Sequence, residues 1–161
     1  MRVLGIDPGT AIMGWGVVEK NKDVGNGVKL VAYGAVKTSP GLDMPMRLKD
    51  LYDGLTAQIK RYKPEAVAIE DLFFFKNQKT VIKVGQARGV AILSAVNLDI
   101  PVFDYTPLQV KQAITGYGRA EKKQVQKMVS LILGMKEVPK PDDAADALAI
   151  AICHLNSSDT R

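Results

Sequence analysis

Short apolar runs separated by turn residues open the chain and predict strands. Residues 3–6 are apolar and rich in β-branched side chains, which is typical of a buried strand. Residues 14–19 and 30–36 repeat the pattern, and the intervening segments 7–10 and 21–27 carry the proline, glycine and asparagine of turns. Three strands joined by such short connections predict an antiparallel meander.

The rest of the chain alternates between helical and strand patterns. Apolar residues recur every three or four positions in the predicted helices, whereas the two further strands are short apolar runs. Thr106 followed by Pro107 has the N-cap and first-position residues of a helix start. The predicted helices cover residues 46–62, 80–97, 107–114, 121–133 and 143–155, and the predicted strands cover residues 66–70 and 101–105.

This order of elements predicts one α/β domain. The antiparallel meander is extended by two parallel strands that helical crossovers connect, which makes a mixed five-stranded sheet flanked by helices. A chain of 161 residues has the size of a single domain with a sizeable core. We expect that domain to cover residues 1–156, with residues 157–161 as a short polar tail.

Composition adds a basic surface to this picture. The chain has 22 Lys and Arg against 17 Asp and Glu, a formal net charge of +5. Such a surface suits a polyanionic partner, although solvated surface lysines give the same composition. The lone Cys153 excludes an intramolecular disulfide. Asp7 comes too early for a signal peptide and apolar runs are too short to cross a membrane, so we expect a cytoplasmic protein.

Three of the predicted elements run into acidic residues. Asp7 ends the first strand, Glu70 ends the fourth, and Asp143 and Asp146 lie in the first turn of the last helix. Carboxylates are costly to bury without a positive partner, and several converging carboxylates repel each other. A divalent cation such as Mg²⁺, which prefers oxygen ligands, would remove both costs. The pattern therefore predicts a metal-dependent enzyme.

Each acid also has an ordinary structural interpretation. Asp143 could cap its helix, and Asp7 could be a residue of the turn that follows it. Two neighbouring acids could also take the metal-binding positions instead. Asp142 and Asp146 also share a helix face, and Asp71 could take the place of Glu70. Strand alternation puts only one of the adjacent pair on the site side, and the preceding apolar run favours Glu70.

Six segments of the chain carry a recognisable pattern: GIDPGT at 5–10, AIEDLFFFKN at 68–77, VGQARG at 84–89, QVKQAITGYG at 109–118, AEKKQVQKMV at 120–129 and DDAADALAIA at 142–151. In these segments the chain resembles the RuvC family of bacterial Holliday junction resolvases. The resemblance implies a ribonuclease H-like fold and places the four catalytic, metal-binding acids of the family on Asp7, Glu70, Asp143 and Asp146. Some family members have histidine at the third position, where this chain has aspartate.

The resemblance also implies a reaction and its cofactor. It implies paired, symmetric cuts in four-way DNA junctions during homologous recombination and DNA repair, leaving 5′-phosphate and 3′-hydroxyl ends. Two Mg²⁺ ions per active site, with Mn²⁺ as a substitute, would activate water and stabilise the leaving oxygen. We expect Asp7 to bridge the two ions, because its strand is the most enclosed.

The same resemblance assigns residues to DNA binding. Lys111 and Lys122 match family lysines near the active site, and Phe73 matches an aromatic residue that stacks on a base. Arg119 beside a glycine loop and Lys76 beside the aromatic loop are further candidates for DNA contact. The lysines could instead lie on solvated helix faces. Solvation and phosphate contact are equally consistent with Lys123 and Lys127, and two of the aromatics at 73–75 could pack under their loop.

Partners and rival functions complete the expectation. A two-fold symmetric junction suits a homodimer, for which the helix at 80–97 is a candidate interface, and the resemblance implies the RuvAB branch-migration complex as a partner. The only histidine, His154, is expected to be structural. An actin-like kinase would need a longer chain. Another ribonuclease H-like nuclease has the same fold, whereas four intact acids argue against a non-catalytic DNA-binding module.

Overall fold

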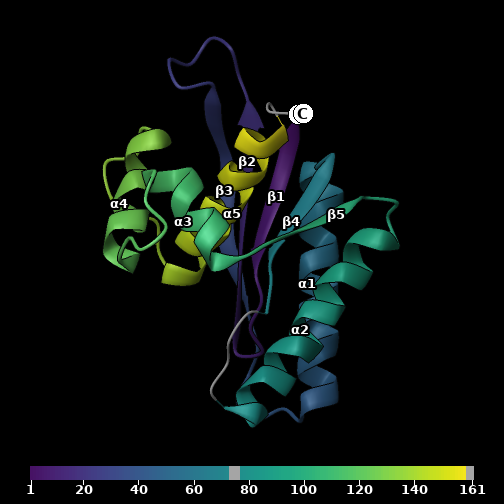
Figure 1. The fold of residues 1–161 in the computed structure, drawn as a ribbon. Helices are drawn as coiled ribbons and strands as arrows, with labels where there is room; N and C mark the ends of the chain where they lie inside the picture. Colours follow the sequence, from purple (N-terminus) through teal and green to yellow (C-terminus); the bar gives the residue numbers. More distant parts are fainter. Residues whose placement is uncertain (73–76, 159–161) are drawn as a thin grey trace.

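The computed structural model describes residues 1–72 and 77–158. Its strands and helices follow one another in the order that the sequence predicts, and Figure 1 shows them along the chain. Among the described residues, no helix is both long and apolar enough to span a membrane. The elements are β1 (Arg2–Asp7), β2 (Ile12–Lys20), β3 (Val28–Lys37), α1 (Met44–Tyr62), β4 (Ala66–Glu70), α2 (Gln78–Val96), β5 (Val102–Tyr105), α3 (Pro107–Thr115), α4 (Lys122–Ile132) and α5 (Asp142–Ser158).

The strands form one mixed sheet with β1 at its centre. Their order is β3-β2-β1-β4-β5, in which β1 pairs antiparallel with β2 and parallel with β4. β3 is antiparallel to β2, and β5 is parallel to β4. The predicted mixed five-stranded sheet is confirmed. The central position of β1 encloses the end of that strand between two neighbours.

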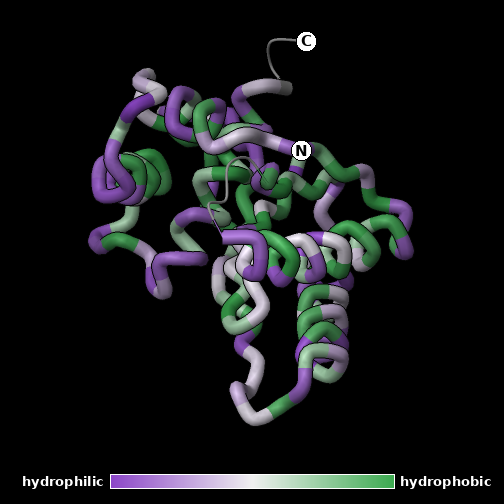
Figure 2. Tube along the Cα trace, turned by 60° about the horizontal axis from the view of Figure 1, so that its bottom comes forward, coloured by the Kyte–Doolittle hydropathy of each residue, from purple (hydrophilic) through white to green (hydrophobic). Residues whose placement is uncertain are grey.

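Helices cover both faces of the sheet and divide the core into two clusters. α5 lies on one face together with α3 and α4, whereas α1 and α2 cover the other (Figure 1). Successive side chains of β1 point to opposite faces of the sheet and so contribute to both clusters. Leu4 and Ile6 pack toward α1 and α2, whereas Val3 packs toward α5. In Figure 2 hydrophobic and hydrophilic stretches alternate along the helices, as expected for helices that bury one side.

Helix α5 packs against β1 and β2 almost backbone to backbone. A Cβ atom built on Gly5 would lie 2.0 Å from the carbonyl oxygen of Ala147, and one on Gly14 would lie 2.0 Å from that of Asp143. On the helix side the contact surface includes Ala147 and Ala151, which are fully buried. The absence of side chains at the two strand glycines therefore fixes how deeply α5 sits on the sheet.

Several element boundaries differ from the sequence prediction by a few residues. α1 begins two residues earlier, because the Asp43 carboxylate accepts a hydrogen bond from the Met46 backbone N–H at 3.2 Å and caps the helix. Asn77 caps α2 in the same way, so that helix also starts early. α5 runs through Ser158, three residues beyond the predicted end of the last helix at residue 155. The Ser157 hydroxyl donates to the Cys153 carbonyl at 2.8 Å, which keeps this polar segment helical.

We expect Gly5→Ala to destabilise the protein by about 3 kcal/mol or more, because the new methyl group must push the α5 backbone away from the sheet. Gly25→Ala is the matched control, since a Cβ there meets nothing within 4 Å, and its effect should stay within about 0.5 kcal/mol. Urea unfolding of both variants measures the difference. Equal midpoints for Gly5→Ala and the unsubstituted protein would contradict this account of the packing.

Candidate metal and nucleic-acid site

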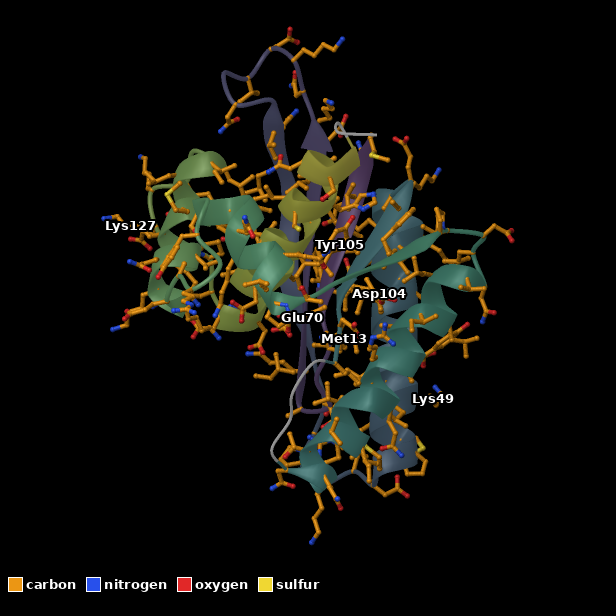
Figure 3. All side chains as sticks on the ribbon, in the orientation of Figure 1. Met13, Lys49, Glu70, Asp104, Tyr105 and Lys127 are labelled. Carbon is orange, nitrogen blue, oxygen red and sulfur yellow. The ribbon has the colours of Figure 1, made fainter. Side chains whose placement is uncertain are left out.

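The strand register brings Asp7 and Glu70 to the same edge of the sheet. β1 and β4 are parallel with Ile6 opposite Ile69, so the two acids follow one residue later on neighbouring strands. Gly5 lies two residues before Asp7 and faces α5. Because strand side chains alternate, Asp7 points to the α5 face, and the same argument from Ala68 places Glu70 there. Figure 3 shows Glu70 near the middle of the molecule.

The N-terminal turn of α5 adds two more carboxylates. The backbone and Cβ of Asp143 lie over Gly14, and Gly14 pairs with Asp7 across β1 and β2. Asp143 is therefore a neighbour of Asp7. Asp146 follows one turn later and lines a cavity together with Glu70. Because glycines on the strands let α5 come close, the acids of the helix lie beside those of the strands.

The competing acids lie in different surroundings. Asp142 is exposed, whereas Asp143 is half-buried beside the sheet. The carboxylate of Asp71 accepts a hydrogen bond from the Leu72 backbone N–H at 2.8 Å, and its own N–H donates to the Tyr105 carbonyl. The hydrogen bonds of Asp71 therefore hold the backbone that follows β4.

Too little positive charge lies near these four carboxyl groups to offset their burial and mutual repulsion. The pKa of Asp7 is raised from 3.8 to about 8, first by burial and then by the neighbouring Asp146, Glu70 and Asp143 carboxylates in that order, against a smaller opposite effect of Lys122. The pKa of Glu70 is also raised, first by burial and then by Asp146. A carboxyl group that resists ionisation in this way marks a place where a cation would be stabilised.

One lysine supplies part of the missing charge. Lys122 Nζ lies 2.9 Å from Asp146 Oδ2, which joins the first turn of α4 to α5. This hydrogen bond raises the pKa of Lys122 above its ordinary value. Burial raises the pKa of Asp146, whereas Lys122 lowers it. Sequence reasoning placed Lys122 near phosphate and did not foresee that it pairs with one of the acids.

A cavity of about 240 Å³ opens between these groups. Two acids and two lysines lie around it, Glu70, Asp146, Lys111 and Lys122. Carboxylate oxygens bind cations and ammonium groups bind phosphate, so the cavity has donors for both halves of a metal-bound phosphodiester. The other lining residues form a mostly apolar wall, which sequence reasoning missed: Pro107, Val110, Val125, Ala149 and Ile150.

The donor set fits a hard divalent cation, but it is not assembled around one. Within residues 1–72 and 77–158, no group of three or more His, Cys, Asp or Glu side chains has the arrangement of a formed metal site. Lys122 instead provides the nearest positive charge to Asp146. The oxygen-only donors and the strongly raised pKa of Asp7 nevertheless match the chemistry of Mg²⁺ rather than that of a softer metal.

The remaining predicted residues lie elsewhere or outside the described residues. Arg119 is exposed in the connection between α3 and α4, and it is absent from the described lining of the cavity. Phe73 and Lys76 fall outside the described residues. His154 is buried, and its Nδ1 lies 2.7 Å from the Tyr105 hydroxyl oxygen.

Sequence reasoning also missed the role of the strand glycines. Gly5 and Gly14 interrupt apolar strand patterns, and such glycines mark close backbone approach. That signal was present in the sequence, because both glycines stand inside predicted strands and Gly5 lies two residues before Asp7. The missing information was which helix approaches the strands.

Comparison with protein families gives one consistent result. The family described as "Crossover junction endodeoxyribonuclease RuvC" matches residues 3–154. A protein of that name from Caldanaerobacter subterraneus subsp. tengcongensis is 58% identical over 98% of this chain and 94% of its own length. Another from Desulforamulus reducens is 56% identical over 99% of this chain and 96% of its own length.

Solved structures agree with the sequence comparison. The structure of T. thermophilus RuvC in complex with a Holliday junction substrate has a TM-score of 0.93 and 40% identity, covering 99% of this chain and 96% of its own. A yeast mitochondrial Holliday junction resolvase has a TM-score of 0.69 over 96% of this chain and 77% of its own. With 16% identity, that second likeness shows the fold alone.

We expect Asp7→Asn to stabilise the metal-free protein, and to do so more strongly as pH rises. The folded-state pKa of about 8 exceeds the ordinary 3.8, so the folded chain binds a proton more tightly and loses stability as pH rises between these values. The variant lacks this loss. At about pH 8 its melting temperature in chelator should be higher by roughly 4 °C or more, and the gain should shrink toward about pH 4. Parallel curves for the two proteins would contradict the raised pKa of Asp7 in the folded protein.

Proposed function

This chain belongs to the RuvC family of crossover junction endodeoxyribonucleases, and from that premise we propose that it resolves four-way DNA junctions. Its activity is then hydrolysis of DNA phosphodiester bonds in homologous recombination and repair. The observation that carries the proposal is the gathering of Asp7, Glu70, Asp143 and Asp146 beside Lys111 and Lys122 at one edge of the sheet. Acidic ligands and phosphate-binding lysines are the parts that a metal-dependent nuclease needs.

The junction is the substrate that the comparisons favour. The T. thermophilus relative was solved with a Holliday junction, and its likeness extends over almost the whole of both chains. A ribonuclease of the same fold would cut RNA–DNA hybrids with the same acids, so the substrate rests on this likeness. A non-catalytic DNA-binding module would have no use for four repelling carboxylates at the cost in stability that Asp7 indicates.

RuvC enzymes are metal-dependent nucleases, and we propose Mg²⁺ as the cofactor, two ions per site, with Mn²⁺ able to replace it. Asp7, Glu70, Asp143 and Asp146 would hold the ions, and Asp7 would be shared because it lies centrally among the other three. Bound divalent cations would activate the attacking water and stabilise the leaving 3′-oxygen, giving 5′-phosphate and 3′-hydroxyl ends.

Two lysines act on the phosphate itself in this proposal. Lys111 on α3 and Lys122 on α4 enter the cavity from helices that face the acids on α5 and β4. Their ammonium groups would hold the scissile phosphate and stabilise the negative charge that develops on it. Lys122 would exchange its Asp146 partner for a phosphate oxygen, since the pair is only partly buried.

Three further residues are proposed to bind the DNA around the cut. Arg119 is exposed beside α4 and would contact the backbone, as would Lys76. Phe73 would stack on a base near the junction centre. Phe73 and Lys76 lie outside the described residues, so their assignment rests on the resemblance of the 68–77 segment to the family.

Paired cuts on a two-fold symmetric junction require two sites, and we propose a C₂ homodimer. α2 offers the surface, because Ile82, Leu93 and Val96 are 61%, 51% and 54% exposed and recur on one face of the helix. Gly89, over which a Cβ would meet nothing within 4 Å, lies on the same face and leaves room for a second helix.

Arg88 does not belong to this proposed interface. Its guanidinium forms an ion pair with Asp104 in β5. The Arg88 side chain is only 20% exposed. Its charge therefore links α2 to the sheet edge of its own chain.

The setting of the reaction is also a proposal. Residues 1–156 would act as a single nuclease domain, in the cytoplasm, where a bacterial chromosome is repaired. The RuvAB branch-migration complex would deliver the junction, as the family resemblance implies. A resolvase that cuts symmetrically benefits from such a partner, because the crossover must be held at a cleavable position while both strands are cut.

We expect Asp7→Asn and Asp146→Asn to abolish junction cutting while junction binding is kept. Each removes a carboxylate ligand but leaves Lys111 and Lys122 in place, so the cutting rate should fall at least about 100-fold with little change in affinity. The measurement is cleavage of a mobile four-way junction in Mg²⁺, beside a linear duplex and an RNA–DNA hybrid, with binding followed in chelator.

Asp23→Asn is the matched control, because Asp23 is exposed just after the end of β2, whereas Asp7 pairs with Gly14 near the start of that strand. It should cut at the unsubstituted rate. Retained cutting by either site variant would count against the metal site. Cutting of the hybrid in place of the junction would reassign the chain to a ribonuclease of the same fold.

We expect Leu93→Glu to shift the protein from dimer to monomer, because it places a charge in the middle of the exposed face of α2. Met46→Glu on α1 changes a side chain of similar exposure, 46%, and should leave the dimer intact. Sedimentation velocity over a range of concentrations measures both. A Leu93→Glu dimer of unchanged strength would move the interface to another surface.

A further inference from the structure

The connection between α3 and α4 presents an aromatic side chain to solvent. Tyr117 is 59% exposed and lies between Gly116 and Gly118. An aromatic ring that is more than half exposed on a loop between two glycines leaves apolar surface in contact with water. Such rings are common in surfaces that bind nucleic acid bases or other proteins.

This loop is held in one conformation by its own hydrogen bonds. The Tyr117 backbone N–H donates to Thr115 Oγ1 at 3.1 Å, and its carbonyl accepts from the Ala120 N–H at 3.1 Å. Gly116 takes the left-handed conformation with φ of 73° and donates its N–H to the Gln112 carbonyl at 2.9 Å. The ring of Tyr117 therefore projects from a fixed base and would lose little entropy on binding.

The loop is also fixed relative to the proposed active site. It joins the helix that carries Lys111 to the helix that begins at Lys122, and both lysines line the cavity beside the acids. The Thr115 hydroxyl oxygen lies 2.8 Å from the Lys111 carbonyl and 3.0 Å from that of Tyr117. Tyr117 is thus tied through one side chain to the backbone of a phosphate-binding residue.

Tyr117 stands at one end of a second groove, along the outer side of α4. The groove has a volume of about 430 Å³, and Gln124, Lys127, Met128 and Leu131 continue it along the helix. Among the described residues that line it, none carries a carboxylate. Figure 3 places Lys127 on the outer side of α4, with Glu70 nearer the middle of the molecule.

Positive charge continues from the active site to this groove. Lys122 faces the cavity, Arg119 and Lys123 are exposed at the start of α4, and Lys127 lies one turn further along. These four cations outnumber the one exposed acid among them, Glu121, which caps the N-terminus of α4. A polyanion held at the cavity would meet these cations where it crosses the loop. We therefore expect a nucleic acid to occupy the groove, because each of these lysines and arginines can bind a phosphate.

We propose that Tyr117 and Lys127 form a second nucleic-acid contact, in which the Tyr117 ring stacks on an unstacked base of the junction strand and Lys127 binds the adjoining phosphate. This inference rests on the proposed function, because it assigns a further contact to the same substrate. A ring and a cation side by side hold a nucleotide at its base and its phosphate without reading sequence. The contact would increase the affinity for the junction and help to orient the DNA, and it would take no part in the cleavage reaction.

The first test compares junction affinity in chelator by fluorescence anisotropy. Tyr117→Ala should weaken binding about tenfold, whereas Tyr117→Phe keeps the ring and should bind as the unsubstituted protein does. Tyr33→Ala removes another exposed aromatic residue, 37% accessible on β3, and should have no effect. A melting temperature within about 2 °C of the unsubstituted protein shows that the exposed position tolerates the change.

A second readout separates stacking from general loss of affinity. Junctions with 2-aminopurine at single positions near the crossover report unstacking and restacking of that base through fluorescence. One position should show a protein-dependent signal that Tyr117→Ala removes at saturating protein and Tyr117→Phe retains. Lys127→Gln should lower the slope of log affinity against log salt by about 1, whereas Lys29→Gln on β3 should leave it unchanged.

The outcomes distinguish this inference from the proposed function. If the unsubstituted protein neither binds nor cuts the junction, both are overturned. If it binds and cuts, and Tyr117→Ala matches it in affinity and in 2-aminopurine signal, the second contact is overturned and the groove is left as a surface for a protein partner. Equal loss in Tyr117→Ala and Tyr117→Phe would overturn stacking in favour of a hydrogen bond from the phenol hydroxyl.

Discussion

Repulsion between carboxylates at one edge of the sheet is the constraint around which the structure is arranged. Asp7 keeps a pKa near 8 because burial and three other acids disfavour its charge. Such crowding persists only where the surrounding backbone leaves the side chains no way to separate. Parallel strands fix two of the acids, and a helix packed directly on strand glycines fixes the others. The metal-free protein accepts this cost, which points to a function that uses the charge.

Lys122 limits the cost and connects the two halves of the site. Its ammonium group pairs with Asp146, so a helix that carries positive charge is held against one that carries negative charge. The same ammonium group borders the cavity where a phosphate would enter. In the proposed function, one side chain would neutralise the resting site and then bind substrate, since a partly exposed ion pair is weak and easily exchanged.

The sequence predicted most of the fold because the strands and helices have clear periodic patterns and turns. It also placed Asp7 and Glu70 together, since both end strands that a crossover makes parallel. It could not predict how close α5 comes to the sheet, because that depends on which helix meets Gly5 and Gly14. It likewise missed the partners of Lys122 and Arg88, because ion pairs between elements far apart in sequence follow from packing.

The contact between α5 and the strand glycines has a consequence for how this sequence can drift over evolutionary time. Most core positions accept a different apolar side chain when a neighbour changes in compensation. Gly5 and Gly14 face backbone atoms of α5, and no substitution of a neighbouring residue removes backbone atoms to make room for a side chain. Lineages that kept this fold would therefore retain both glycines even where the apolar strand residues beside them have been exchanged, whether or not they kept the cutting activity.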